Sequence, residues 1–288
     1  MMAAVRLTRR TAVAACCAAC WVAPAAAGQQ RMPLRLGLTP VFLDNQVAFL
    51  HDWRAYLGVK LRRPLEFVQR GSYREVVGLL RQGQLDLAWL CGYPYVRNEA
   101  ALQLLAMPLY LGQPLYQSYL VVPATDRHTT TLLDLRGTVF AYSDPDSNSG
   151  HLFPLYSLLK VREAPAGFFA RTFFTWGHRK VVEAVSVGLA RGGAVDGYVW
   201  DTLALRHPAL TARTRIVERS PPFGFPPFVA RGSLPRAEVD AVRQVLVGMS
   251  NDAEGSRLLD QLNLDGFVPG RADLFDRVRA MAKLVDGT

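Results

Sequence analysis

Two stretches of this chain repeat one pattern, in which polar residues after a glycine open a helix and an aspartate then precedes an apolar strand. In the first copy, Gly71-Ser72-Tyr73 precedes the helix and Gly83-Gln84-Leu85-Asp86 follows it. In the second copy, Gly177-His178-Arg179 and Gly192-Gly193-Ala194-Val195-Asp196 hold the same places. Strands that alternate with helices at this short spacing predict an α/β fold with largely parallel sheets. The two copies predict two lobes of similar construction with a cleft between them.

Two extended segments are typical of crossovers between such lobes. Tyr116 to Pro123 is rich in β-forming residues, and Pro221 to Val229 is rich in proline. We expect the helical patterns after the second crossover to return to the first lobe, which then comprises residues 28–120 and 226–288, with the second lobe from 121 to 225. A hinged pair of lobes is an architecture for closing around a ligand. Ligands of open α/β sheets lie beyond the strand C-termini, so we expect the site there.

Local signals predict several helix ends. Asp44 is a candidate N-cap for a helix that carries Trp53 and Leu57 and stops at Gly58. Ser72 and Glu75 form a capping box for the next helix. Near the C-terminus, periodic apolar residues predict helices over 235–251, 252–262 and 273–285.

The stretch from Gly137 to Val161 carries the clearest binding signal. A short buried strand is predicted for Gly137 to Tyr142, and helical spacing resumes from His151 to Val161. Between them, the loop Ser143 to Gly150 places hydroxyls, an amide and a glycine at a helix start. The unpaired N–H groups and the positive end of the helix dipole favour an anion, and glycine permits close approach. The loop therefore predicts an oxyanion cradle, the alternative being an ordinary N-cap.

The first 27 residues have the features of a secretory signal peptide. Arg6, Arg9 and Arg10 precede an alanine-rich, nearly uncharged segment, and small residues up to Ala27 fit a cleavage site before Gly28. We expect a periplasmic protein, exported by either the Sec or the twin-arginine route. Lipidation at Cys16 is the alternative, although the apolar run before it is short.

Charge and cysteine content limit the partners. Three of the four cysteines (Cys16, Cys17 and Cys20) lie in the removable segment, so Cys91 is left without a disulfide partner. The chain has a net charge of +9, but its basic residues are scattered rather than grouped in blocks. This distribution argues against nucleic acid and suits a small anionic ligand. We expect a monomer with no metal or cofactor.

The ligand loop and the helix starts supply candidate contacts. Ser147 and Ser149 can donate hydrogen bonds to an anion, beside Asn148 and Gly150 of the same loop. We expect the second lobe to supply most of the charge recognition through backbone N–H donors, because the loop contains no basic residue before His151.

Three further candidates stand outside this loop. Tyr73 and His178 each lie at a predicted helix start, where the side chain could reach an oxygen or serve in packing and capping. Asp196 could accept a hydrogen bond from a protonated oxyanion or cap a strand end.

Cys91, Tyr93 and Tyr95 follow the first-lobe strand. Alternation along an extended chain predicts that one tyrosine faces the cleft while the other packs. A buried cysteine is commonly a small apolar residue, and Cys91 as a ligand is the alternative. A Cys91–His178 or Ser149–His178 dyad would need contact between the two side chains, and the sequence contains no nucleophile elbow and no P-loop. We expect no enzyme.

Several of these segments, in this order, resemble the phosphate/phosphite/phosphonate-type periplasmic solute-binding proteins of ABC importers. Tyr73 with Gly83-Gln84-Leu85-Asp86-Leu87-Ala88-Trp89 is similar to the family's Tyr, helix, Gly-x-x-Asp-x-Ala-Trp block. Asp144-Pro145-Asp146-Ser147-Asn148-Ser149-Gly150 resembles its oxyanion-gripping loop, with Asn148 where phosphonate binders usually have Thr. Gly177-His178 matches the position of a ligand-contacting His, and Val195 to Val199 resembles a second-lobe strand.

The resemblance implies a type II periplasmic binding protein that captures a phosphonate, phosphite or phosphate for an ABC importer. The segment Phe225-Pro226-Pro227 lacks the acidic residue that some members carry in the second hinge. A subset of the superfamily senses arsenite through a cysteine, which implies an alternative: a sensor-type protein that uses Cys91 and serves a membrane sensor kinase. A type II-fold enzyme using Cys91 is the remaining alternative.

Overall fold

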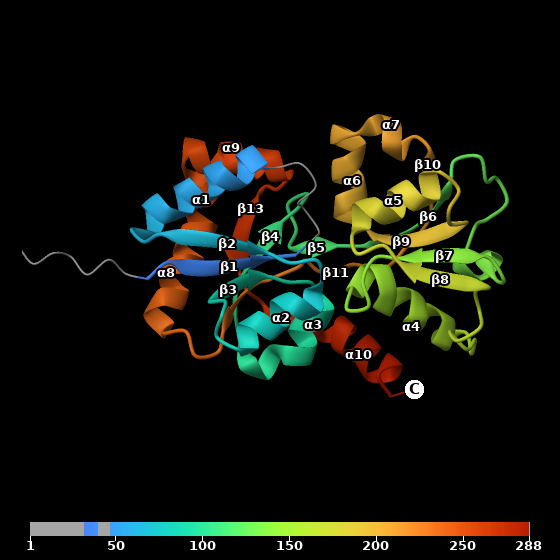
Figure 1. The fold of residues 1–288 in the computed structure, drawn as a ribbon, viewed down its shortest axis with the longest axis horizontal. Coiled ribbons are helices and arrows are strands. Elements are labelled where there is room, and N and C mark those ends of the chain that lie inside the picture. Colours follow the sequence, from blue (N-terminus) through green and yellow to red (C-terminus); the bar gives the residue numbers. More distant parts are fainter. Residues whose placement is uncertain (1–31, 40–46, 288) are drawn as a thin grey trace, which may run out of the picture. The chain divides into compact units, whose positions relative to one another are not determined.

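The computed structural model describes residues 32–39 and 47–287, apart from the side chain of Val47. The predicted signal peptide and the predicted cap at Asp44 lie outside the described residues. Within them, the chain forms a six-stranded sheet, a five-stranded sheet and a two-stranded ladder (Figure 1). We call the six-stranded sheet with its helices the first lobe and the five-stranded sheet with its helices the second lobe.

The first lobe is built from both ends of the described chain. Its strands are β1 (Leu34–Leu38), β2 (Leu65–Gln69), β3 (Leu87–Trp89), β4 (Leu102–Leu109), β12 (Phe228–Arg231) and β13 (Gly266–Pro269). Its helices are α1 (Val47–Leu61), α2 (Tyr73–Arg81), α3 (Gly92–Asn98), α8 (Arg236–Val247), α9 (Ala253–Leu262) and α10 (Asp276–Val285). The strand order is β13-β4-β12-β3-β1-β2, so β12 and β13 bring the chain back to this sheet after the proline-rich segment.

The second lobe comes from the middle of the chain. Its strands are β6 (Ser118–Pro123), β7 (Val139–Tyr142), β8 (Arg171–Phe174), β9 (Gly192–Asp196) and β10 (Thr214–Arg219), in the order β10-β6-β9-β7-β8. Its helices are η3 (Asn148–Leu152), which continues into α4 (Phe153–Lys160), and α5 (His178–Ser186), α6 (Gly197–Arg206) and α7 (Pro208–Thr211). Figure 1 shows α5, α6 and α7 on one side of this sheet and α4 on the other.

Both sheets are mixed rather than largely parallel as predicted. In each, three neighbouring strands run parallel, β2-β1-β3 and β8-β7-β9, because each is joined to the next by a helical crossover. The strands that enter through the crossovers, β12 and β6, pair antiparallel with β3 and β9. The chain passes from one sheet to the other at the two-stranded ladder of β5 (Leu115–Tyr116) with β11 (Phe223–Gly224). Residues 118–120, expected in the first lobe, thus lie in the second sheet.

Two predicted element ends differ from the structure. Helix α1 continues past Gly58 to Leu61, because an added turn costs little where a helix already packs on a sheet. The predicted strand over Val195 to Val199 is wrong: β9 ends at Asp196, whose carboxylate accepts from the Val199 N–H and so starts α6 at Gly197. The capping box of α2 is confirmed at Ser72, which accepts from the Glu75 N–H.

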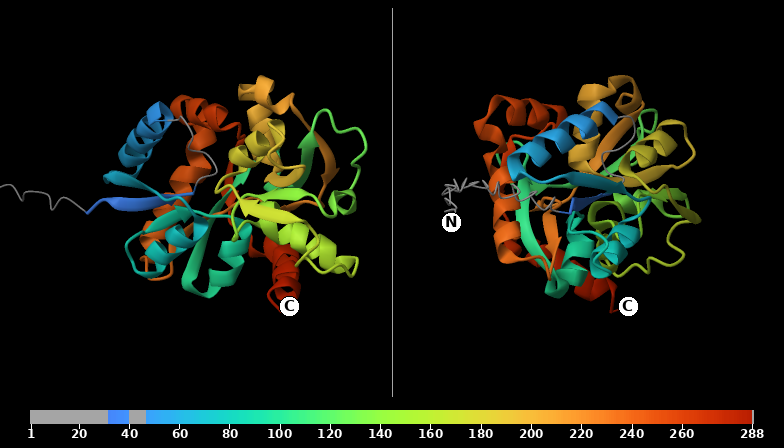
Figure 2. Two further views of the ribbon diagram at one scale, coloured as in Figure 1. Left: turned by 45° about the vertical axis from the view of Figure 1, so that its right-hand side comes forward. Right: turned by 60° about the vertical axis from the view of Figure 1, so that its left-hand side comes forward.

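Helix α10 contacts both lobes. It packs against α3 of the first lobe and against α4 and η3 of the second (Figures 1 and 2). The helix therefore adds a third connection between the lobes, beside the two crossovers.

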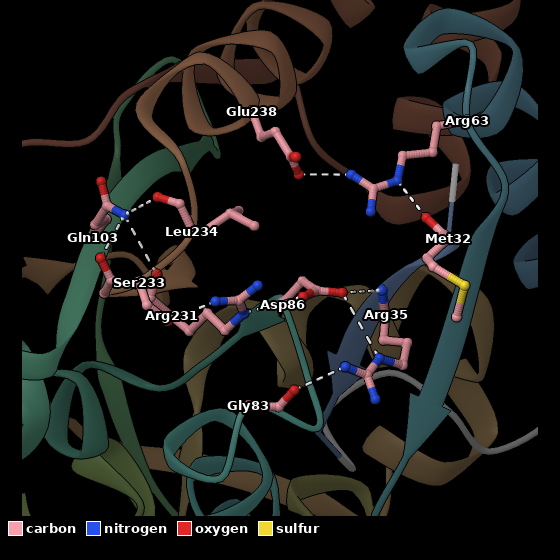
Figure 3. A network of polar contacts seen from close by, with 11 residues as sticks. Met32, Arg35, Arg63, Gly83, Asp86, Gln103, Arg231, Ser233, Leu234 and Glu238 are labelled. Carbon is pink, nitrogen blue, oxygen red and sulfur yellow. Dashed lines mark hydrogen bonds and ion pairs between the residues drawn. The ribbon is translucent and has the colours of Figure 1, made fainter. Parts of the chain in front are cut away.

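At the N-terminal edge of the first sheet, charged side chains are paired with one another. Figure 3 shows Asp86 between Arg35 of β1 and Arg231 of β12. Its carboxylate accepts from the Arg35 backbone N–H at 3.0 Å and from Arg231 Nε at 3.1 Å. This network joins three neighbouring strands, β12, β3 and β1, at the edge from which β3 starts.

Candidate functional site

Five helices of the two lobes begin at one buried cluster of side chains. Tyr73 and His178 are the first residues of α2 and α5, Asn148 is the first residue of η3, and Cys91 and Asp196 are the N-caps of α3 and α6. All five are buried, with at most 3% of each residue exposed. Helix N-termini carry partial positive charge and free N–H groups, so their convergence creates a setting suited to an anion.

His178 connects the two lobes. The Asp196 backbone N–H donates to His178 Nδ1 at 3.0 Å, and His178 Nε2 faces the Tyr73 hydroxyl at 3.5 Å. Burial lowers the pKa of His178 to about 3, so the ring is neutral near pH 7. A neutral ring that accepts at Nδ1 must carry its proton on Nε2. His178 therefore presents a donor at the junction of α2 and α5.

Asp196 is a carboxyl group without a basic partner in the site. Burial raises its pKa to about 8, although N–H groups of Val199 and Tyr198 oppose the rise. The group therefore holds a proton near neutral pH. A carboxyl in this state can donate to an oxyanion, or share one proton with it.

The ligand loop, residues 143–150, is held in place by its own polar groups. The Ser147 hydroxyl accepts from the Gly150 N–H at 3.0 Å, so Ser147 is an N-cap. Asp144 accepts from the Asp146 N–H at 2.7 Å and, across the lobes, from the Tyr73 N–H at 3.2 Å. Ser118 of β6 donates to the Ser149 carbonyl at 2.7 Å. Capping and ligand contact are thus compatible readings of the same loop.

Three polar atoms of this loop are buried without a hydrogen-bond partner: Ser143 Oγ, Asn148 Oδ1 and Ser149 Oγ. The Ser149 hydroxyl lies near enough to Tyr116 to lower that phenol's pKa, which burial holds well above its usual value, yet no group meets it in hydrogen-bond geometry. Among the described residues, the other buried side-chain atom in this state is Trp53 Nε1 in the first lobe. Unpaired buried polar atoms cost about 1–3 kcal/mol each, so three on one loop indicate a place for a ligand's polar groups.

Gly150 is required by the close packing of its neighbour Ser143, and the close approach of a ligand at this glycine stays a prediction. A Cβ at this position would lie 1.9 Å from Ser143 Oγ and 2.7 Å from Ser143 Cβ. The glycine therefore lets the loop fold back tightly enough to bury the Ser143 hydroxyl.

Cys91 contacts the ligand loop across the lobes. Its Sγ accepts from the Asn148 backbone N–H at 3.3 Å. Burial raises the thiol's pKa to about 11, so the group is a neutral thiol near pH 7. The structure brings Cys91 to the candidate site together with Tyr73, His178, Asp196 and the loop.

Tyr93 and Tyr95 are not brought there. The Tyr93 hydroxyl donates to Asp286 at 2.5 Å, and the Tyr95 ring packs on Phe275 with 4.8 Å between centroids. Phe275 immediately precedes α10, and Asp286 immediately follows it. The prediction assumed an extended chain, but Gly92 to Asn98 is helix α3, in which strand alternation does not apply.

Tyr116 and Ser143 belong to the cluster and were not among the predicted contacts. The Tyr116 hydroxyl accepts from Asn148 Nδ2 at 2.8 Å. Tyr116 stands in the predicted first crossover, and a large side chain with a polar tip at a hinge was the available signal. For Ser143 the sequence offered only its membership of the loop.

Asp146 links the outer side of the loop to the first lobe. Its carboxylate lies 3.4 Å from Arg74 Nε of α2 and 3.6 Å from an Arg97 nitrogen of α3. Arg97 also lies 3.8 Å from Asp286, just after α10. Both arginines are exposed, so solvent screens these ion pairs. They lie beside the buried hydrogen bonds that join the loop to the first lobe.

In residues 32–39 and 47–287, no group of three or more His, Cys, Asp or Glu side chains is placed to hold a metal ion. In the same part of the chain, no helix has both the length and the apolar surface that crossing a bilayer requires.

The curated proteins that are similar in sequence include the following two. The phosphate-import protein PhnD of Mycolicibacterium smegmatis is 29% identical over 150 residues, 48% of this chain and 46% of that protein, so the matched region spans about half of the relative. The phosphonates-binding periplasmic protein of Escherichia coli is 25% identical over 263 residues, 87% of this chain and 75% of that protein.

A solved structure supports the fold. PhnD1 of Prochlorococcus marinus, determined with methylphosphonate, superposes with a TM-score of 0.78 at 18% identity over 88% of this chain and 98% of that one. This likeness confirms the two-lobed periplasmic binding protein fold. The profile of the family described as "ABC transporter, phosphonate, periplasmic substrate-binding protein" matches residues 36–275. The chain therefore belongs to the family of periplasmic substrate-binding proteins of phosphonate ABC transporters.

Proposed function

We propose that this protein captures a small phosphonate-class oxyanion, such as a phosphonate, phosphite or phosphate, between its lobes and delivers it to an ABC importer. The observation that carries the proposal is the ligand loop, where buried hydroxyls of Ser143 and Ser149 lack partners at a point where helices of both lobes begin. A tetrahedral anion supplies several acceptors for such donors. Membership of the family supports the class of ligand, and the geometry supports the choice of residues.

We propose Tyr73, His178, Asp196 and residues 147–150 as ligand contacts, with Tyr116 and Ser143 added. Tyr73 and His178 come from different lobes and lie 3.5 Å apart, so a ligand that contacts both would bridge the lobes. Each would offer a neutral donor, and Asp196 would offer its proton. We propose no role in ligand contact for Tyr93 and Tyr95, which pack toward the C-terminal segment.

Thermal unfolding of the purified protein tests the proposal. Methylphosphonate, aminoethylphosphonate, phosphite, phosphate and sulfate are each added, and calorimetry measures the dissociation constant of any that raises the melting temperature. A ligand at one hundred times its dissociation constant adds about 2.7 kcal/mol to the free energy of unfolding. Absence of a shift with all the phosphorus compounds at millimolar concentration would overturn the proposal.

The arsenite-sensor alternative receives less support from the geometry. Soft ligands bind thiolates, whereas the Cys91 thiol has a pKa raised to about 11 and already accepts a hydrogen bond from the ligand loop. Titration of arsenite into the parent and into Cys91→Ser, under reducing conditions, separates the two functions. Arsenite binding that vanishes in the variant would favour the sensor, and phosphite binding that persists in the variant would favour the importer component.

A further inference from the structure

The side-chain amide of Asn148 offers an unused acceptor to the site. Asn148 is fully buried, its Nδ2 donates to the Tyr116 hydroxyl at 2.8 Å, and its backbone N–H donates to Cys91 Sγ at 3.3 Å. Its Oδ1 has no partner. A carbonyl oxygen can only accept hydrogen bonds, so the atom can be satisfied only by a group that carries a hydrogen.

The contact with Tyr116 sets the orientation of this amide. The Tyr116 hydroxyl that accepts from Nδ2 also acts on Cys91, where it opposes the rise in pKa that burial causes. Because the Tyr116 hydroxyl accepts from Asn148 Nδ2, the oxygen Oδ1 is the end of the amide that stays without a partner. Rotation of the amide would break the contact with Tyr116.

The charges of the side chains in the cluster also favour a ligand that keeps a proton. Side chains of five elements face one another here: Tyr73 of α2, Cys91 before α3, Tyr116 of β5, His178 of α5 and Asp196 before α6. They are two phenols, a thiol, a neutral imidazole and a carboxyl, none of which is a cation near neutral pH. Helix N-termini supply only partial positive charge. A buried dianion would leave two charges to these partial charges alone, whereas a monoanion that keeps one proton leaves only one.

We propose that Asn148 is a specificity-determining residue that selects oxyanions carrying a proton, through a hydrogen bond from the ligand's P–OH to Asn148 Oδ1. The inference rests on the proposed function, because it concerns the same ligand site. It assigns the ligand class more narrowly, as the singly protonated monoanion of a phosphonate, phosphite or phosphate. Fully ionised oxyanions of the same shape, such as sulfonates and sulfate, would leave Oδ1 unpaired and place a second acceptor against it.

The test compares two ligands that differ by one proton. Methylphosphonate at about pH 6 is mostly a monoanion with one P–OH, and methanesulfonate is a monoanion of nearly the same size with none. Isothermal calorimetry on the purified protein measures both dissociation constants. We expect methylphosphonate to bind more tightly by about tenfold or more, the effect of one unpaired buried acceptor.

Two variants assign the discrimination to Asn148. Asn148→Leu removes the acceptor and should bring the ratio of the two dissociation constants close to one. Ser149→Ala is the matched control: it removes a neighbouring hydroxyl and keeps Oδ1, so both ligands should weaken by similar factors and the ratio should stay. Thermal melts without ligand show whether each variant is folded. If Asn148→Leu does not fold, the ratio of the two dissociation constants in the parent still tests the proposal.

Three outcomes would overturn the inference, and they differ from one another. Equal binding of the two ligands by the parent would refute selection for a proton while the proposed function stands. A ratio unchanged in folded Asn148→Leu would place the acceptor on another residue. Failure of methylphosphonate, phosphite and phosphate all to bind would remove the proposed function and this inference with it.

Discussion

Asp86 and Asp196 occupy the same place in the repeated sequence pattern, yet they lie in opposite chemical settings. Asp86 precedes β3 at the N-terminal edge of its sheet and accepts from Arg35 and Arg231 (Figure 3). Asp196 ends β9 at the opposite edge, caps α6 and has a raised pKa because it is buried without a cation. A carboxylate that serves the fold is paired within it. A carboxyl placed where the strands end and helices begin keeps bonding capacity for something else.

The largest effect is expected at the paired carboxylate. Asp86→Asn removes the charge that two arginines share, and the free energy of unfolding should fall by about 2–3 kcal/mol, less than for a fully buried pair because both arginines are partly exposed. Urea unfolding measures the loss. Ligand affinity, measured under conditions where the variant is fully folded, should not change. A large change in affinity with little loss of stability would contradict the contrast between the two edges.

The tight packing of the ligand loop gives the next effect. Gly150→Ala places a Cβ 1.9 Å from Ser143 Oγ, and such overpacking should lower stability by about 1–3 kcal/mol. Gly78→Ala in α2 is the control, because no atom lies within 4 Å of its added Cβ and alanine favours the helix. Ser143→Gly should restore much of what Gly150→Ala loses. Equal stability of the two alanine variants in urea would contradict the packing of the loop.

Asp196 should make stability depend on pH in a direction opposite to that of an ion-paired carboxylate. Its pKa is raised from 3.8 to about 8 in the folded protein, so the folded state binds the proton more tightly. The stabilising contribution is complete below the unfolded pKa and is lost as the pH rises toward about 8, by at most about 1.4 kcal/mol per pH unit. Asp196→Asn, a neutral side chain of the same shape, should abolish this slope.

Urea unfolding of the parent and Asp196→Asn at several pH values between 5 and 8.5 measures the difference, in the absence of ligand. The gap in stability should change in favour of the variant as the pH rises. His178 contributes a loss only below its unfolded pKa, because its folded pKa is lowered to about 3. Parallel curves for the two proteins would mean that Asp196 does not hold its proton in the empty site.

The smallest effect concerns the exposed pairs of Asp146. Asp146→Asn removes its contacts with Arg74 and Arg97, so closure of the lobes should weaken and ligand affinity should fall by a few fold, consistent with up to about 1 kcal/mol for screened pairs. The difference between parent and variant should shrink at high salt. A loss of affinity that is independent of salt would show that Asp146 acts through the shape of the loop instead.

Much of the fold was accessible from local patterns. The capping box at Ser72, the loop with its following helix, and the crossovers at Tyr116 and Pro221 were predicted because caps, periodicity and proline act over a few neighbouring residues. The prediction that Tyr93 or Tyr95 faces the cleft assumed an extended chain. The residues before them, a strand and Cys91, give no capping signal for the helix that begins at Gly92. The strand predicted over 195–199 failed similarly, since apolar residues continue across a strand end into α6.

By itself, the sequence determined that this chain forms two α/β lobes, that they are joined through extended crossovers, and that a loop rich in hydroxyls lies at a helix start. Only the tertiary structure decided which polar groups find partners. Arg231 reaches Asp86 across 145 positions, and Cys91 reaches Asn148 across 57. Such contacts depend on strand order and lobe closure rather than on neighbouring residues. Asp86 and Asp196 occupy similar places in the sequence, yet Asp86 forms structural ion pairs at one edge of its sheet and Asp196 holds a proton at the opposite edge of the other.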